Sequence, residues 1–351
     1  SRHSTRHSQS ISATLTLTST EPKTQNERKK TMSVITERNE SLRVFEKAAE
    51  RGTSIGIFCT ASYWNTEAIL IAAQRIAEKY QIEKVPVVVA TTFTYPHMPQ
   101  CRRFLYCQDP KTGILSHFAY LNVLAGSKYS PYKNVAVLPH LDHANPVRDR
   151  WALTCALPYF SSVMFDAQLY PFEENMALTA EYVKNYGNDV LVEGILESLN
   201  VSDGAVATHI DNYCENAVKY VKTTGVDFAV ADLGTEQQST SVGKARYDKA
   251  RARELTAALG RKMLVLHGTS CLANEQTRGL ASDGVVRVNM WTRIAREAGQ
   301  HAAEQVVSRM DKINAGDFNS TESMAYMRDS VEKAADIMEE MMELFGYANL
   351  A

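Results

Sequence analysis

The chain has 351 residues, of which 44% are hydrophobic, enough for one large α/β domain or two of medium size. Its formal net charge of −2 gives no reason to expect a nucleic acid or a membrane surface as a partner. No uninterrupted apolar run reaches the length of about 18 residues that predicts a membrane span. The six cysteines show neither a CxxC pair nor regular spacing, which is typical of reduced intracellular thiols.

Residues 1–32 differ from the rest of the chain in composition. Eleven of the first twenty residues are Ser or Thr, and no acidic residue precedes Glu21. Such a segment cannot bury enough apolar surface to fold, so we expect residues 1–32 to be a disordered extension and residues 33–351 to form a single domain. We expect a cytoplasmic protein, or an organellar one if the extension is a transit peptide.

From Ser33 onward, short apolar segments alternate with helical patterns. The predicted strands are Ser54–Thr60, Val85–Phe93, Val135–Asp142, Ser161–Asp166, Asp189–Leu196, Phe228–Gly234, Lys262–Gly268 and Val285–Met290. The helical patterns include Glu67–Tyr80, Glu174–Tyr186, Asp211–Thr223, Lys244–Leu259 and Ile294–Met310. Eight strands covered on both faces, each with a following helix, predict an α/β fold, a (β/α)8 TIM barrel with the helical tail Met324–Phe345 packed on it. A doubly wound open sheet is the alternative, but no GxGxxG opens a helix.

A His-x-Asp-His motif, His140-Leu141-Asp142-His143, closes the third predicted strand. Because side chains alternate along a strand, His140 and Asp142 share one face, and His143 takes the other as the chain turns out. This cluster can bind a divalent metal and hold a proton-transfer acid beside it; the alternative is a polar strand end with satisfied histidines. A second apolar run that ends in His267 at a Gly/Ser-rich turn favours the metal site.

Chemically capable residues follow several of the predicted strands, and in a barrel these strand ends meet on one face. They are Asp142, His143, Asp166, Glu193, Glu236, Gln237, His267, Asn289 and Thr292. Two histidines and a third donor make a metal site with positions open to substrate oxygens. Small donors and backbone N–H groups at Gly268, Ser270, Asn289 and Thr292 can cradle a phosphate.

These motifs resemble those of the class II ketose-bisphosphate aldolases, zinc enzymes on a (β/α)8 barrel. The resemblance runs from Ser54 to Leu350 and is specific in the order and spacing of its motifs. The matching motifs are Trp64–Glu67, His140–His143, Ser162–Asp166 followed by Pro171–Asn175, Val192–Glu193, Thr224–Asp227, Leu266–Ser270 and Leu344–Gly346.

The resemblance implies roles for individual residues. His143 and His267 match two of the family's three zinc-binding histidines. Asp142 matches the acid that moves a proton to and from the substrate hydroxyl, and Glu193 is the second catalytic candidate. Zinc would polarise the ketose carbonyl and stabilise the enediolate left when the carbon–carbon bond breaks. The candidates for binding substrate and phosphate are Thr92, Gly234, Gly268, Ser270, Asn289 and Thr292.

The chain also departs from the family pattern. The family's Gly-Thr-x-His-Gly element, which supplies the remaining zinc ligand, reads Gly234-Thr235-Glu236-Gln237-Gln238 here. A neutral amide is a poor zinc ligand, so we expect Glu236 as the third ligand in preference to Gln237. Trp291 replaces the Asp of the family's Asn-x-Asp-Thr, and Arg328 is out of register with the Arg that grips a distal phosphate from the neighbouring subunit. These departures argue against fructose 1,6-bisphosphate as the substrate.

We therefore expect a metal-dependent carbon–carbon lyase acting on a phosphorylated ketose or a related polyol-derived substrate. The expected cofactor is Zn²⁺ or another divalent metal, with a monovalent cation as a further ion, and the expected assembly is a homodimer or homotetramer. Two alternatives stay open: a catalytically silent barrel with a binding or assembly role, and an isomerase or decarboxylating lyase on the same barrel. His97 and His117, in a polar connection, are expected at the surface.

Overall fold

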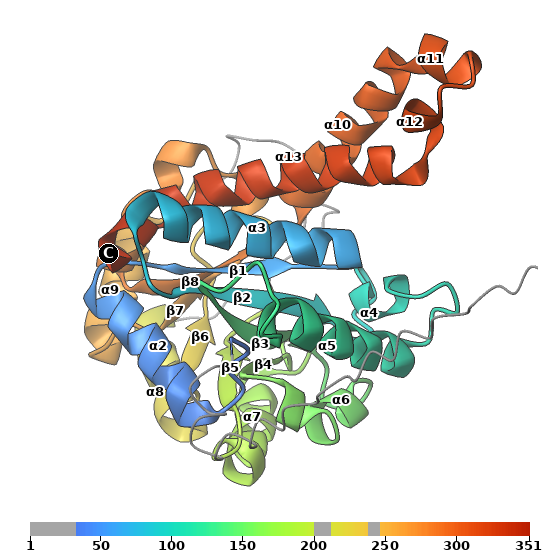
Figure 1. Ribbon diagram of the computed structural model, residues 1–351. Helices are drawn as coiled ribbons and strands as arrows, with labels where there is room; N and C mark the ends of the chain where they lie inside the picture. The colour runs from blue at the N-terminus through green and yellow to red at the C-terminus, as the bar shows by residue number, and fades with distance from the viewer. Residues whose placement is uncertain (1–32, 200–211, 238–245) are drawn as a thin grey trace, which may run out of the picture. The chain divides into compact units, whose positions relative to one another are not determined.

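The computed structural model describes residues 33–199, 212–237 and 246–351, and these form a closed barrel of eight parallel strands in sequential order (Figure 1). The strands are β1 Ile55–Cys59, β2 Val85–Thr92, β3 Val135–Ala144, β4 Ser162–Phe165, β5 Leu191–Ile195, β6 Phe228–Val230, β7 Leu264–Leu266 and β8 Val285–Met290. Pairing of β1 with β8 closes the barrel, which confirms the TIM barrel and excludes the open sheet. Residues 1–32, predicted to be disordered, lie outside the described residues.

Helices surround the barrel. They are α2 Arg38–Glu50, α3 Tyr63–Tyr80, α4 Gln100–Arg103, α5 Pro110–Gly126, α6 Arg150–Thr154, α7 Phe172–Tyr186, α8 Tyr213–Thr224, α9 Lys249–Leu259, α10 Thr292–Ser308, α11 Met310–Asn314, α12 Phe318–Thr321 and α13 Ser323–Leu344. Ser62 caps the amino end of α3, because its side chain accepts a hydrogen bond from the amide of Asn65. No described helix is both long enough and apolar enough to cross a membrane.

The strands β6 and β7 are shorter than the sequence predicts. We expected them to reach Gly234 and Gly268, but both glycines adopt left-handed backbone conformations, with φ of 82° and 69°. A residue in that conformation leaves the extended path that strand pairing needs, so neither glycine can belong to the ladder. Between β7 and β8 the chain forms three short 3-10 turns instead of the α-helix that a strict strand–helix repeat predicts.

The amino end of the barrel is closed by α2. Phe45 of this helix lies against Phe228, the first residue of β6, with ring centroids 5.1 Å apart. Phe45 and Ala48 are both buried in the inner core of the barrel. With this end filled by apolar side chains, the polar strand ends at the opposite, carboxyl face remain as the place for chemistry.

The carboxyl-terminal helix packs back on the barrel, as predicted. α13 lies beside α3 and α10, and Met338, Met341 and Met342 of α13 are buried in the core. Figure 1 shows α10 and α13 extending together beyond the barrel, with α11 and α12 at the far end of this projection. These flexible side chains therefore fill the core between the helices and the barrel.

Candidate metal centre and active site

Asp142 and His143 both lie at the carboxyl end of β3, although neighbouring residues of a regular strand point to opposite faces. The register against β4 shifts between Leu141 and Ala144, and His143 has a left-handed φ of 47°. Such an irregularity redirects one side chain, so the two neighbours can reach the same pocket. A non-glycine residue in this conformation is strained, and strain of this kind concentrates at functional sites.

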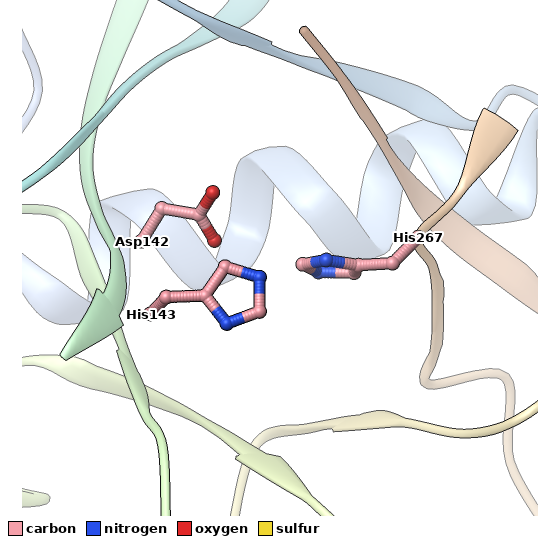
Figure 2. A group of neighbouring side chains, drawn as sticks. All are labelled: Asp142, His143 and His267. Carbon is pink, nitrogen blue, oxygen red and sulfur yellow. The ribbon is translucent and has the colours of Figure 1, made fainter. Parts of the chain in front are cut away.

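Three buried side chains meet above the barrel core. Asp142, His143 and His267 each offer one donor atom, and these atoms all lie within 4.8 Å of one another. Figure 2 shows Asp142 and His143 next to each other, with the ring of His267 facing them from the opposite side. Two imidazole nitrogens and one carboxylate oxygen at this spacing form a donor set suited to a divalent transition metal.

Gln237 presents its side-chain amide to both histidines. Its terminal nitrogen lies 3.4 Å from Nε2 of His143 and 3.5 Å from Nδ1 of His267. Glu236, which we expected as the preferred third ligand, is half-buried, does not line the pocket and is not part of the three-residue donor group. The side chain next to the two histidines is therefore Gln237, whereas Glu236 lies half-buried between the buried residues Thr235 and Gln237.

Each metal-facing histidine has a carboxylate at its other ring nitrogen. Nδ1 of His143 lies 2.8 Å from Oδ2 of Asp166, and Nε2 of His267 lies 3.5 Å from Oε1 of Glu193. Carboxylates in this position fix the tautomer and orientation of metal-binding histidines. Glu193, which we expected as a catalytic residue, lies beside His267 and does not line the pocket.

The acidic and basic groups of the cluster stabilise one another in their charged forms. Burial alone would lower the pKa of His143, but the carboxylates of Asp142 and Asp166 raise it to about 9. Burial would raise the pKa of Asp142, yet His143 and His267 hold that pKa below its usual value. In the metal-free protein, Asp142 is therefore a carboxylate and His143 an imidazolium at neutral pH. A cation bound there would compete with the proton on His143.

An arginine that we did not single out from the sequence lies below the cluster. The guanidinium of Arg287 is fully buried, with Nη1 3.0 Å from Oε2 of Glu193 and Nη2 3.2 Å from Oγ of Ser162. It also lies 4.9 Å and 4.8 Å from the ring centroids of Phe45 and Phe228. The signal was present in the sequence, since a charged residue interrupts the apolar strand Val285–Met290.

Most of the predicted substrate residues line one pocket with the metal-facing side chains. The predicted residues in its wall are Thr92, Asp142, His143, Gln237, His267, Gly268, Ser270, Asn289 and Thr292, and the wall lacks Gly234. Residues that we did not assign to substrate complete the wall: Cys59, Tyr95, Met98, Gln100, Thr269 and Trp291. Tyr95 stacks on the ring of His143, with centroids 4.5 Å apart.

His117, expected at the surface, is buried in α5 with an exposed fraction of 1%. Its ring stacks on Phe104 at 4.5 Å, and burial lowers its pKa to about 3. The polar residues around His117 led us to expect an exposed side chain, but this position of α5 faces the core. His97 is exposed, as predicted.

The architecture and the site define the class of protein: a (β/α)8 barrel with a histidine–carboxylate cluster at the carboxyl ends of its strands. The sequence matches the family "Fructose-bisphosphate aldolase class-II" over residues 39–350, and the chain belongs to that family. This confirms the resemblance seen in the sequence.

Relatives and solved structures agree with this membership. The fructose-bisphosphate aldolase of Streptococcus pneumoniae is 27% identical over 306 residues, which cover 86% of this chain and 95% of that protein. The structure of fructose-bisphosphate aldolase from Campylobacter jejuni has a TM-score of 0.72 at 18% identity, covering 91% of this chain and 97% of that one. The YdjI aldolase of Escherichia coli K12 has a TM-score of 0.60 at 19% identity, covering 87% and 96%. At these identities the two structures show a shared fold.

Proposed function

We propose that this chain is a metal-dependent lyase that cleaves a carbon–carbon bond of a phosphorylated ketose by a retro-aldol reaction. The observation that carries the proposal is the meeting of Asp142, His143 and His267 within 4.8 Å in a class II aldolase barrel. The residues fit a divalent ion such as Zn²⁺, because buried ring nitrogens of His143 and His267 face the side-chain amide of Gln237. The carboxylate of Asp142, whose Oδ1 is buried without a hydrogen-bond partner among the described residues, adds negative charge beside them. When bound, the ion would act as a Lewis acid on the substrate carbonyl.

His143 and His267 would hold the ion, and we propose the amide oxygen of Gln237 as the third protein ligand. The amide nitrogen of Gln237 lies near both histidines, and a 180° rotation of the amide would place its oxygen there, whereas Glu236 does not line the pocket. A neutral amide binds zinc more weakly than an imidazole does, so Gln237→His should raise zinc affinity. If Asp142 were the third ligand instead, Asp142→Asn would release the metal, while Gln237→Ala would not.

Asp142 is the proposed acid–base residue. Its Oδ2 accepts a hydrogen bond of 3.1 Å from Nδ2 of Asn289, which orients the carboxylate in the pocket. As the substrate bond breaks, the hydroxyl proton of one half passes to Asp142 and that half leaves as an aldehyde. The electron pair of the broken bond stays with the ketone half. We propose Glu193 as a positioning residue for His267 rather than as a catalytic group.

The phosphate of the ketone half would bind beside β7 and β8. Gly268, Ser270 and Thr292 line this side of the pocket, and Thr292 begins the 17-residue helix α10. The amino end of a helix offers unpaired N–H groups and a positive dipole to an anion. Ser270 lies at the same helix end, because its hydroxyl accepts a hydrogen bond from the amide of Arg293, the second residue of α10.

A catalytically silent protein is the second candidate, and the specific observation that favours it is Gln237 beside the two histidines. Retro-aldol assays on a panel of ketose mono- and bisphosphates, with the wild-type protein loaded with Zn²⁺, separate the two. Release of an aldehyde that is lost in His143→Ala supports the lyase. No aldehyde release from any substrate by a metal-loaded, folded protein would favour the silent barrel. The homodimer or homotetramer stays a prediction.

A further inference from the structure

A second cavity adjoins the pocket, and we call it the side cleft. Its walls include Trp64 and Asn65 of α3, Trp291 just before α10, Gly299 of α10 and Tyr326 of α13. Among the described residues that line the side cleft, none is Asp, Glu, Lys, Arg or His. The cleft therefore offers aromatic and apolar surface with a few neutral polar groups.

The side cleft adjoins the pocket that contains the metal-facing residues. Trp291 lines both cavities. Asn65, in the wall of the cleft, donates a hydrogen bond of 3.0 Å from Nδ2 to the carbonyl oxygen of Cys59, which lines the pocket. Both connections lie at the carboxyl ends of β1 and β8, and these strands are paired with each other. This placement would let a molecule in the pocket extend past Trp291 into the side cleft.

Asp142 indicates which half of the substrate would extend there. Its Oδ2 lies 3.1 Å from Nδ2 of Asn289 on β8 and 3.5 Å from Sγ of Cys59 on β1. The proposed acid thus faces the side of the pocket where the cleft begins. In the proposed reaction Asp142 takes the hydroxyl proton of the half that leaves as an aldehyde. That half is therefore the one next to the side cleft.

We propose that the side cleft binds the aldehyde half of the substrate and that this half is uncharged, with an apolar or aromatic part. This inference rests on the proposed function and specifies its substrate class. A phosphate in the cleft would lose water without gaining a cation from the described lining residues, which is costly. Trp64, Trp291 and Tyr326 instead offer large apolar faces with polar edges.

Gly299 allows a direct test, because a Cβ added there would meet no atom within 4 Å. Gly299→Leu should fill the cleft without disturbing the fold, since leucine is a better helix former than glycine. Gln300→Leu is the matched control: it adds the same side chain at the next, exposed position of α10, outside the cleft. The metal-loaded protein is assayed for aldol addition of dihydroxyacetone phosphate to hexanal, glyceraldehyde 3-phosphate and glycolaldehyde. In each addition a carbon–carbon bond forms, the donor carbon loses a proton and the aldehyde oxygen gains one.

Wild type is expected to prefer hexanal over glyceraldehyde 3-phosphate in kcat/KM. Gly299→Leu should lower kcat/KM for hexanal at least about tenfold, the scale of losing space for methylene groups in an apolar pocket. Glycolaldehyde, too short to enter the cleft, should be unaffected, and Gln300→Leu should behave as wild type. A wild-type preference for the phosphorylated aldehyde, or equal losses for hexanal and glycolaldehyde in Gly299→Leu, would overturn the proposal.

A binding measurement separates this inference from the proposed function. Saturable quenching of tryptophan fluorescence by 1-hexanol, a non-reacting probe, is expected in wild type and Gln300→Leu and should weaken at least about tenfold in Gly299→Leu. If no aldehyde reacts but 1-hexanol binds in this way, the lyase proposal fails and the cleft assignment stands. If 1-hexanol does not bind saturably to wild type, the cleft assignment is overturned. A changed oligomeric state in Gly299→Leu, with 1-hexanol binding unaltered, would overturn it too and assign the cleft to contact with a second copy.

Discussion

Asp142 combines two properties that a proton-transfer acid needs. It is fixed by the hydrogen bond from Asn289, and the neighbouring histidines lower its pKa, so that it is ready to accept a proton at neutral pH. A structural carboxylate would serve mainly to hold its neighbours in place. The two roles differ in what the removal of its charge should do.

Replacing Asp142 by Asn keeps the shape of the side chain and removes the titratable group. With Gln237 as third ligand, Asp142→Asn should keep fold and metal and lose turnover by roughly 100-fold or more. Steady-state kinetics with metal analysis of the same sample checks this. A variant with full turnover on an established substrate would show that the proton is handled elsewhere.

Arg287 and Glu193 form a fully buried ion pair inside the barrel. Removing one partner of such a pair leaves an uncompensated buried charge, which costs about 3–5 kcal/mol. Arg287→Met should therefore lower the free energy of unfolding by about that amount, and a simultaneous Glu193→Gln should restore much of it. Urea unfolding of the two single variants and the double variant measures the coupling. Additive losses would contradict a paired role.

His117 gives a pH dependence whose sign follows from burial. Its pKa is about 3 in the folded protein against the ordinary histidine value of 6.5, so the unfolded chain binds more protons below pH 6.5. The stability due to neutral His117 is complete above pH 6.5 and is lost as pH falls toward 3. Between pH 7 and pH 5, the free energy of unfolding should therefore fall by about 2 kcal/mol less in His117→Phe than in wild type. Parallel stability curves for the two proteins over that range would refute this assignment.

At the scale of elements, the site depends on how strands end. β3 ends with a register shift that turns His143 toward Asp142, and β7 ends at Leu266, two residues before the left-handed Gly268. A Cβ on Gly268 would lie 2.7 Å from the backbone carbon of Glu236, so the turns after β6 and β7 can approach only because this residue is glycine. That approach brings Gln237 beside His267.

Gly268→Ala should therefore destabilise the protein by about 1–3 kcal/mol more than Gly260→Ala. Gly260 is a matched control, because it has a φ of 72°, close to the 69° of Gly268, but open space around its Cβ position. The difference between the two variants isolates the steric contact from the backbone strain. Thermal unfolding measures it, and equal losses in the two variants would show that the contact has no effect.

For the whole molecule, the periodicity of apolar segments predicted eight strands covered on both faces, and the number of strands together with the missing GxGxxG favoured the barrel over an open sheet. It could not predict where β6 and β7 end, because β6 stops at Val230 and β7 at Leu266, before the left-handed Gly234 and Gly268. The motifs predicted Asp142, His143 and His267 correctly as neighbours. They could not decide between Glu236 and Gln237, because that choice depends on the turn after β6. The buried contacts of Arg287 and the walls of the side cleft bring together segments that are distant in the sequence, so the sequence patterns did not predict them.

Metal content is the most direct test of the central claim that His143 and His267 form a divalent-metal site. The whole protein, saturated with Zn²⁺ and passed through a desalting column, is analysed by elemental analysis beside His143→Ala, His267→Ala and the exposed-site control His97→Ala. We predict about one ion per chain in wild type and in His97→Ala, and loss of the ion in the other two variants. Folded wild type that retains no zinc, or His143→Ala that retains as much as wild type, would contradict the account.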